Sequence, residues 1–135
     1  MAIGVDFDGT LSQVSFYNPS LRLPWWLFFL LIPLVLARPN RKIVKALRKL
    51  EKNSAEVIII SARPRQLSFL TKMWLKLYRV PYSQLFCIGF GKGTKQRKLA
   101  IIQQKNITTF IDDDKRTLIF LEENSVEVLP ANSFR

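Results

Sequence analysis

Five of the ten acidic residues of this chain are aspartates that stand in two short groups. Asp6 and Asp8 lie in VDFDGTL near the start, and residues 112–114 lie in FIDDD near the end. Each group directly follows a short apolar run, which is the pattern of a buried strand that ends in a turn. The chain contains no histidine, so histidine-based nucleophile pairs and zinc sites are excluded. Acid–base chemistry must therefore fall to these carboxylates or to lysines.

The elements that must position these aspartates alternate between strands and helices. The apolar pattern predicts strands at 2–5, 56–60, 85–89, 109–111 and 126–129, and helices at 42–52, 65–78 and 94–104. The strand candidates are continuously apolar, which is typical of a parallel sheet buried on both faces. We therefore expect the α/β class, as a small doubly wound, Rossmann-like parallel sheet. In the second helix the expected buried residues are Leu67, Leu70, Trp74 and Leu77, and Thr94 is the expected N-cap of the third.

Ligands of such sheets bind at the carboxyl ends of the strands. The sequence places Asp6, Ser61 and Asp112 after the first, second and fourth predicted strands. An isolated aspartate or serine at such a place is usually a turn former or a helix cap. The joint placement of all three at one edge of the sheet indicates a site instead.

The order VDFDGTL, IIISARP, a basic helix start and FIDDD resembles the haloacid dehalogenase (HAD) superfamily of phosphohydrolases. The resemblance covers most of the chain, apart from an apolar insert and the C-terminal tail. It implies one HAD-like domain over residues 1–135, with a hydrophobic cap insert over residues 12–40. It also implies a Mg²⁺-dependent phosphatase that hydrolyses phosphomonoesters through an aspartyl-phosphate intermediate.

The resemblance assigns roles to individual residues of the first two motifs. Asp6 would attack phosphorus, and Asp8 would protonate the leaving group and then activate water. Gly9 would allow the tight turn, Thr10 would help to hold the phosphoryl group, and Ser61 would donate a hydrogen bond to it.

The resemblance also implies a metal site and a catalytic lysine. Mg²⁺, a hard cation that takes oxygen ligands, would be held by Asp6, the carbonyl of Asp8, Asp112 and Asp113. Asp114 is instead the expected cap of a following helical turn. The lysine that neutralises the phosphoryl charge is Lys95 or Lys98, which the sequence favours equally, with Lys92 ranked third.

The net charge of +11 favours a polyanionic partner, either nucleic acid or an anionic membrane surface. The uncharged segment 23–37 (LPWWLFFLLIPLVLA) is flanked by arginines and broken by Pro24 and Pro33. It is shorter than the roughly 20 residues that span a bilayer. We expect residues 22–42 to form a peripheral anchor on an anionic membrane. A hydrophobic cap over the site and a dimer contact remain open alternatives, and the oligomeric state is not indicated.

The N-terminus lacks the pattern of a signal peptide, and the lone Cys87 fits a reducing compartment. We therefore expect a cytoplasmic protein, peripheral on the inner face of a membrane, that hydrolyses a phosphorylated substrate there. One alternative is a nucleotide or nucleic-acid end phosphatase, which the charge supports although no nucleic-acid-binding motif does. Another is a non-catalytic membrane-associated adaptor with a HAD fold, which would have no need for the clustered aspartates.

Overall fold

The computed structural model describes residues 1–7, 10–11, 38–89 and 91–134. Five parallel strands form one sheet in the order β3-β2-β1-β4-β5. The strands are β1 (Ala2–Asp6), β2 (Glu56–Ser61), β3 (Gln84–Cys87), β4 (Ile107–Asp112) and β5 (Glu127–Pro130). All five predicted strands are therefore present, and the sheet is parallel as expected.

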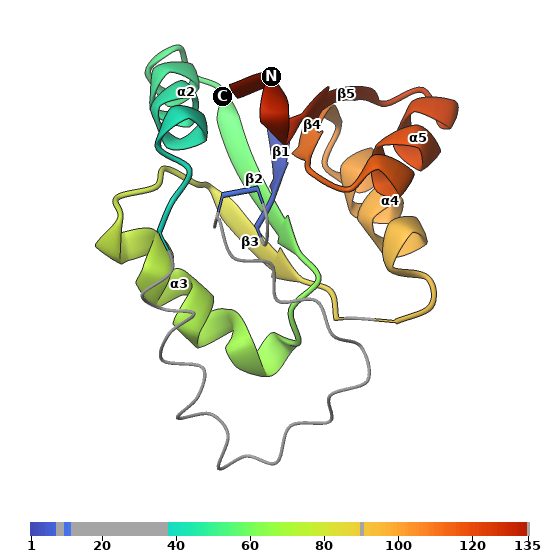
Figure 1. Ribbon diagram of the computed structural model, residues 1–135, viewed down its shortest axis with the longest axis horizontal. Helices are drawn as coiled ribbons and strands as arrows, with labels where there is room; N and C mark the ends of the chain where they lie inside the picture. Colours follow the sequence, from blue (N-terminus) through green and yellow to red (C-terminus); the bar gives the residue numbers. More distant parts are fainter. Residues whose placement is uncertain (8–9, 12–37, 90, 135) are drawn as a thin grey trace.

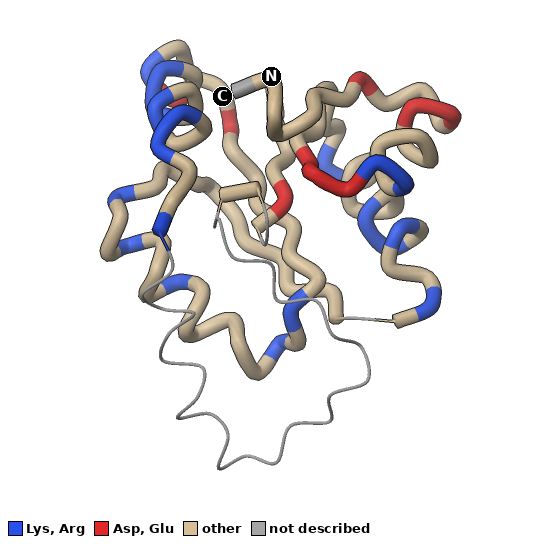
Figure 2. Tube along the Cα trace, viewed as in Figure 1, with Lys and Arg blue, Asp and Glu red and all other residues tan. Residues whose placement is uncertain are grey.

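Helices cover both faces of this sheet (Figure 1). One face carries α2 (Arg41–Lys52) and α3 (Ser68–Leu77), and the other carries α4 (Thr94–Gln104) and α5 (Lys115–Glu123). Short 3₁₀ turns precede α3 (Arg65–Leu67) and follow β5 (Ala131–Phe134). Exposed lysines and arginines gather on α2, the helix at the upper left of Figure 2. The doubly wound α/β fold is thus confirmed.

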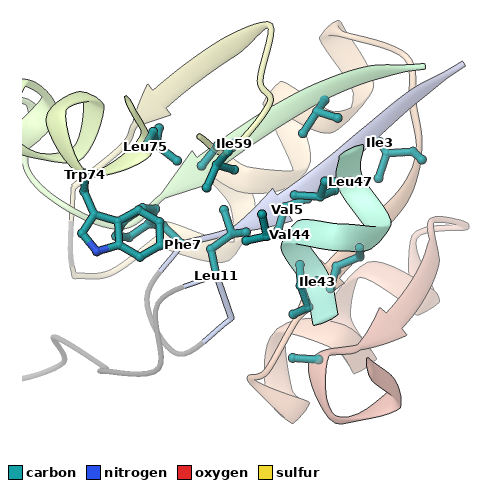
Figure 3. Packing of buried hydrophobic residues seen from close by; sticks show 14 of the residues in the cluster. Ile3, Val5, Phe7, Leu11, Ile43, Val44, Leu47, Ile59, Trp74 and Leu75 are labelled. Carbon is teal, nitrogen blue, oxygen red and sulfur yellow. The ribbon is translucent and has the colours of Figure 1, made fainter. Parts of the chain in front are cut away.

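The strands divide their side chains between two cores. In β2, Val57 and Ile59 pack with the helices α2 and α3, whereas Ile58 and Ile60 pack with α4 and α5. Successive side chains of a strand point to opposite faces, so a strand buried on both faces must be apolar at every position. This explains the unbroken run of isoleucines. Figure 3 shows the first core, in which α2 and α3 close over β1.

The strand order places the first and last motifs next to each other. The chain proceeds from β1 through β2 to β3, and then crosses to the other side of β1 to form β4. Val5 of β1 pairs with Ile111 of β4, so Asp6 and Asp112 end neighbouring strands. This reversal of strand order is the usual place for a ligand in such sheets.

The buried face of α3 differs from the prediction. Of the four residues expected to be buried, Leu67 and Trp74 are buried as predicted, Leu70 is half-buried, and Leu77 is 59% exposed. Thr71 and Leu75 are buried although they were not expected to be. The α-helix begins only at Ser68, because the preceding residues form a 3₁₀ turn. Leu77 lies on the same α-helix as Trp74 but about 60° around it, on the side away from Thr71 and Leu75, so it falls outside the buried stripe.

Thr94 is not the N-cap of α4. The cap position is occupied by Gly93, which has a left-handed backbone with φ of 83°. Thr94 is the first helical residue, and its hydroxyl donates to the carbonyl oxygen of Gly91 at 2.7 Å. The N-cap therefore lies one residue earlier than expected, at a glycine that makes no side-chain hydrogen bond to the first turn.

The predicted insert 12–40 lies mostly outside the described residues, as do Pro24 and Pro33. Its two ends, however, are described. The amide of Asn40 donates to the carbonyl of Leu11 at 2.7 Å, so the chain returns to the point that it left. Among the helices of the described ranges, none combines the length and the apolar character needed to cross a membrane.

Gly4 leaves room for an aromatic ring on the neighbouring strand. A Cβ added at Gly4 would lie 2.5 Å from Cδ2 of Phe110, which is fully buried. Gly4→Ala is expected to lower the free energy of unfolding by about 2 kcal/mol, since a packed core cannot admit the extra methyl group. Urea denaturation measures this loss. The loss should shrink in a Phe110→Leu background, and equal losses in both backgrounds would contradict the steric cause.

Candidate active site

Three polar side chains lie buried at the carboxyl ends of the three central strands. Asp6 ends β1, Ser61 ends β2 and Asp112 ends β4, and their exposures are 6%, 0% and 1%. Asp8 and Gly9 lie outside the described residues. Burial of two carboxylates so close together is costly unless cations or hydrogen-bond donors compensate for it.

Lys98 provides part of that compensation. Its Nζ lies 3.1 Å from Oδ1 of Asp6 and 3.0 Å from Oδ2 of Asp112. The side chain belongs to α4, which covers the same face of the sheet as α5, and it is only 5% exposed. Burial by itself would lower the pKa of this ammonium group, but the charges of Asp6 and Asp112 outweigh it and raise the pKa. Lys98 is therefore a charged group held between the two carboxylates.

One lysine does not balance all of the negative charge. Burial and the charge of Asp112 raise the pKa of Asp6 well above 3.8, although Lys98 acts in the opposite direction. Partial burial and the charge of Asp112 likewise raise the pKa of Asp113 to about 6. The fold thus holds a cluster whose charged form is disfavoured until a further cation arrives.

A metal ion fits this cluster. Asp6, Asp112 and Asp113 each offer one carboxylate oxygen, and these oxygens lie within 4.8 Å of one another. All three donors are hard oxygens, which suit Mg²⁺ or Ca²⁺ rather than a softer metal. A divalent cation would also neutralise the charge that Lys98 leaves unbalanced.

Thr10 and Ser61 add hydroxyl groups around the carboxylates. The Thr10 hydroxyl is fully buried and is placed to donate to Oδ2 of Asp6 at 3.4 Å or to Oδ1 of Asp113 at 3.3 Å. Oγ of Ser61 accepts from the backbone amide of Arg63 at 3.1 Å, which fixes the serine side chain at the strand end. Thr10 thereby joins the first motif to the last.

The chain is similar to known proteins in sequence and in fold. No family model matches the chain. A nucleotidase of Clostridium acetobutylicum is 30% identical over 95 residues, which are 70% of this chain and 46% of the nucleotidase. The chain therefore spans about half the length of that relative.

Two solved structures share the fold. A chain of the Pnkp1/Rnl/Hen1 RNA repair complex superposes with a TM-score of 0.72 at 18% identity, over 96% of this chain and 41% of that one. The HAD domain of the effector protein Lem4 from Legionella pneumophila superposes with a TM-score of 0.55 at 14% identity, over 96% of this chain and 83% of that domain's chain. The chain therefore has the fold of a HAD domain. Its sheet, which ends in Asp6, Ser61 and Asp112, is the core of that fold.

The two lysines left open by the sequence occupy different places in this HAD-like core. Lys98 contacts Asp6 and Asp112, as described above. Lys95 is half-buried in the first turn of α4, and no bond to either aspartate is found for it among the described residues. Lys92 is exposed in the loop before the helix.

Asp114 has the capping role that was expected of it. Its side chain accepts from the backbone amide of Arg116 at 3.4 Å and from the Thr117 hydroxyl at 2.6 Å, at the start of α5. Partial burial acts to raise its pKa, but these hydrogen bonds outweigh that effect and lower the pKa. Its carboxylate is thus committed to the helix.

Arg63 is a residue of the site region that the sequence analysis did not single out. It is 3% exposed, its guanidinium lies 4.4 Å from the centre of the Phe7 ring, and it donates to the Thr71 hydroxyl at 3.2 Å. Phe7 is the residue between the two aspartates of the first motif. Its ring also packs edge-on against Trp74, with 4.9 Å between the two ring centres (Figure 3). The one signal in the sequence is a charged residue two positions after the end of a buried strand.

Proposed function

We propose that this protein is a Mg²⁺-dependent phosphomonoesterase in which Asp6 is the nucleophile. The observation that carries the proposal is the surroundings of the Asp6 carboxylate. One of its oxygens is bonded to Lys98 and the other faces Thr10, while Asp112 lies beside it on the next strand. A carboxylate held in this way is oriented and is kept in contact with a positive charge, as an attacking group requires.

The proposed reaction has two displacement steps. In the first, a carboxylate oxygen of Asp6 bonds to phosphorus, the bond to the substrate oxygen breaks, and Asp8 gives its proton to that leaving oxygen. In the second, Asp8 takes a proton from water, the water oxygen bonds to phosphorus, and the Asp6–phosphorus bond breaks. Inorganic phosphate leaves, and both aspartates return to their first states.

The remaining site residues would hold the phosphoryl group. Ser61 and Thr10 would donate hydrogen bonds to its oxygens, Gly9 would allow the backbone to turn beside it, and Lys98 would offset its charge. Mg²⁺ would be held by Asp6, the Asp8 carbonyl, Asp112 and Asp113, and it would neutralise charge shared between carboxylates and phosphate.

We further propose that the enzyme acts at a membrane surface on the cytoplasmic side. Residues 1–135 would form one domain, with residues 12–40 as a hydrophobic insert and residues 22–42 as the anchor on an anionic bilayer. The hydrogen bond between Leu11 and Asn40 supports attachment from one side, because a single crossing would separate the two ends by about 30 Å.

A nucleotide or nucleic-acid end phosphatase is the second candidate. Two likenesses favour it: the relative from Clostridium acetobutylicum is a nucleotidase, and one structural neighbour belongs to an RNA repair complex. The same site residues would serve both candidates, so the two differ only in the group that carries the phosphate.

A substrate panel tests these proposals. We expect turnover of an aryl phosphate with Mg²⁺ and none with excess EDTA. Phosphatidic acid in vesicles, nucleoside monophosphates and end-phosphorylated oligonucleotides would then separate the two candidates by kcat/KM. Mg²⁺ binding by calorimetry provides a readout that is independent of activity. If no divalent metal supports turnover of any of these compounds, the protein is the non-catalytic adaptor instead.

A further inference from the structure

The outward face of α3 carries a row of apolar side chains. Phe69, Met73 and Leu77 are 69%, 46% and 59% exposed. They are spaced four residues apart, so they lie above one another on one side of the helix. Single exposed apolar residues are ordinary on a protein surface, but a continuous row on one helix is a patch that calls for a partner.

Positive charge surrounds this apolar row. Lys72 and Lys76 lie on the same helix and are exposed, and Arg65 and Arg79 lie at its two ends. The chain has no acidic residue between Arg65 and Arg79. The row is therefore an apolar strip with cations along its length and at both ends.

The neighbouring helix continues the positive surface. Five exposed cations follow the outer side of α2: Arg41, Lys42, Lys45, Lys49 and Lys52. A sixth, Arg48, donates to the carbonyls of Tyr78 and Arg79 and so ties the end of α3 to α2. Residues 38–83, which contain both helices, hold twelve of the 21 lysines and arginines but only two of the ten acidic residues. In Figure 2, α2 is largely blue and α3 carries blue segments but no red one, whereas the red segments lie mainly toward α5.

We propose that the outer surface of α2 and α3 docks on an anionic lipid bilayer, with Phe69, Met73 and Leu77 inserted among the lipids. This combination of apolar row and flanking cations is the pattern of an interfacial helix. Cations attract the anionic headgroups while the apolar side chains leave water. A phosphate backbone would use the cations but not Met73 and Leu77, so the apolar row favours lipid over RNA.

The position of α3 suits a phosphate carried by a lipid. The helix follows directly after Ser61 and the 3₁₀ turn, so its Phe69 end lies toward the edge of the sheet that bears the site. Its inner side contacts the site region through Trp74 and Thr71, which meet Phe7 and Arg63. The docking surface thus deepens the membrane part of the proposed function and rests on it.

The first test is vesicle flotation of the full chain. The variant Phe69→Gln/Met73→Gln/Leu77→Gln is expected to lose about tenfold or more of its partitioning to vesicles of phosphatidylcholine with phosphatidylserine. Ile119→Gln is the matched control, because Ile119 is 58% exposed on α5 and should leave partitioning unchanged. Unchanged flotation of the triple variant would overturn the proposal.

The cations are tested in the same assay. Lys72→Gln/Lys76→Gln is expected to reduce partitioning to anionic vesicles by about tenfold. The control pair is Lys115→Gln/Arg116→Gln on α5, which should have little effect. RNA docking is the rival outcome. The lipid assignment would be overturned if a single-stranded oligoribonucleotide bound tightly and lost affinity in Lys72→Gln/Lys76→Gln, while the apolar triple variant bound vesicles as well as wild type.

A site-specific label gives a measurement that does not depend on overall affinity. An environment-sensitive fluorophore on Met73→Cys in a Cys87→Ser background is expected to shift to the blue when anionic vesicles are added. The fluorescence of the same label on Ile119→Cys should not shift. Equal shifts at both positions would contradict the proposal that the protein docks through α3. Neither assay requires turnover, so loss of aryl phosphatase activity with intact docking would refute only the catalytic proposal.

Discussion

Asp6→Asn is expected to reduce kcat for an aryl phosphate by about 10⁴-fold or more, because an amide cannot form the acyl-phosphate bond. The substitution preserves shape at a buried position and keeps an oxygen that can accept from Thr10. The comparison of kcat between wild type and variant under saturating Mg²⁺ measures this effect. Asp114→Asn is the matched control. It makes the same change of carboxylate to amide in the second aspartate group, residues 112–114, but should retain the cap of α5 and most of the activity.

The same substitution should not destabilise the metal-free protein. Burial and Asp112 raise the pKa of Asp6 in the fold, so folding favours the protonated form. Stability is therefore greatest below the unfolded value of 3.8 and falls as the pH rises through the folded pKa. Metal-free Asp6→Asn should show a smaller fall in Tm over that range. Full activity in the variant, or a Tm far below that of wild type, would contradict the role assigned to Asp6.

The parallel sheet was predictable because its physical requirements are local. A strand covered on both faces must be apolar at each position, and Val57 to Ile60 meets that condition. The strand ends were less predictable. Ser61 and Asp112 are the last residues of their strands rather than residues after them, since ladder pairing with neighbouring strands extends to polar side chains. Backbone hydrogen bonding, unlike side-chain burial, leaves little trace in composition.

The phase of α3 was not predictable from apolar spacing alone. Leu67, Leu70, Trp74 and Leu77 match a helical period over the whole range 65–78, yet the segment begins with a 3₁₀ turn. The buried stripe of the α-helix runs through Thr71, Trp74 and Leu75, and Leu77 lies about 60° from Trp74 on the other side. This difference matters for function, because an inward-facing Leu77 would not belong to the exposed row on which the docking proposal rests.

The choice between Lys95 and Lys98 depended on tertiary structure in the same way. Residues three apart lie on nearly the same side of a helix, so sequence spacing favours neither. The structure separates them because Lys98, in the second turn of α4, reaches Asp6 and Asp112 at the ends of β1 and β4. Arg63 escaped notice for a related reason: nothing in its sequence context shows that a guanidinium would be buried against Phe7.

Lys98→Met is expected to have the second large effect, on stability as well as on turnover. Removal of the ammonium leaves Asp6 and Asp112 buried side by side with no cation between them. Loss of one partner from a buried ion cluster costs about 3–5 kcal/mol, so we expect a fall of about 3 kcal/mol in the free energy of unfolding of the metal-free protein. The loss of positive charge at the phosphoryl group should also lower kcat by about 10²–10³-fold.

Mg²⁺ distinguishes an electrostatic role of Lys98 from a packing role. If the lysine balances carboxylate charge, a divalent cation can replace part of that function, and Mg²⁺ should raise the Tm of Lys98→Met more than that of wild type. The Nζ of Lys98 also lies 5.7 Å from the centre of the Phe110 ring. If the lysine only fills space beside that ring, methionine should substitute for it and the metal should stabilise both proteins equally. Lys95→Met is the matched control on the same helix, with little expected change in Tm or kcat. A large loss in that control would transfer the catalytic assignment from Lys98 to Lys95.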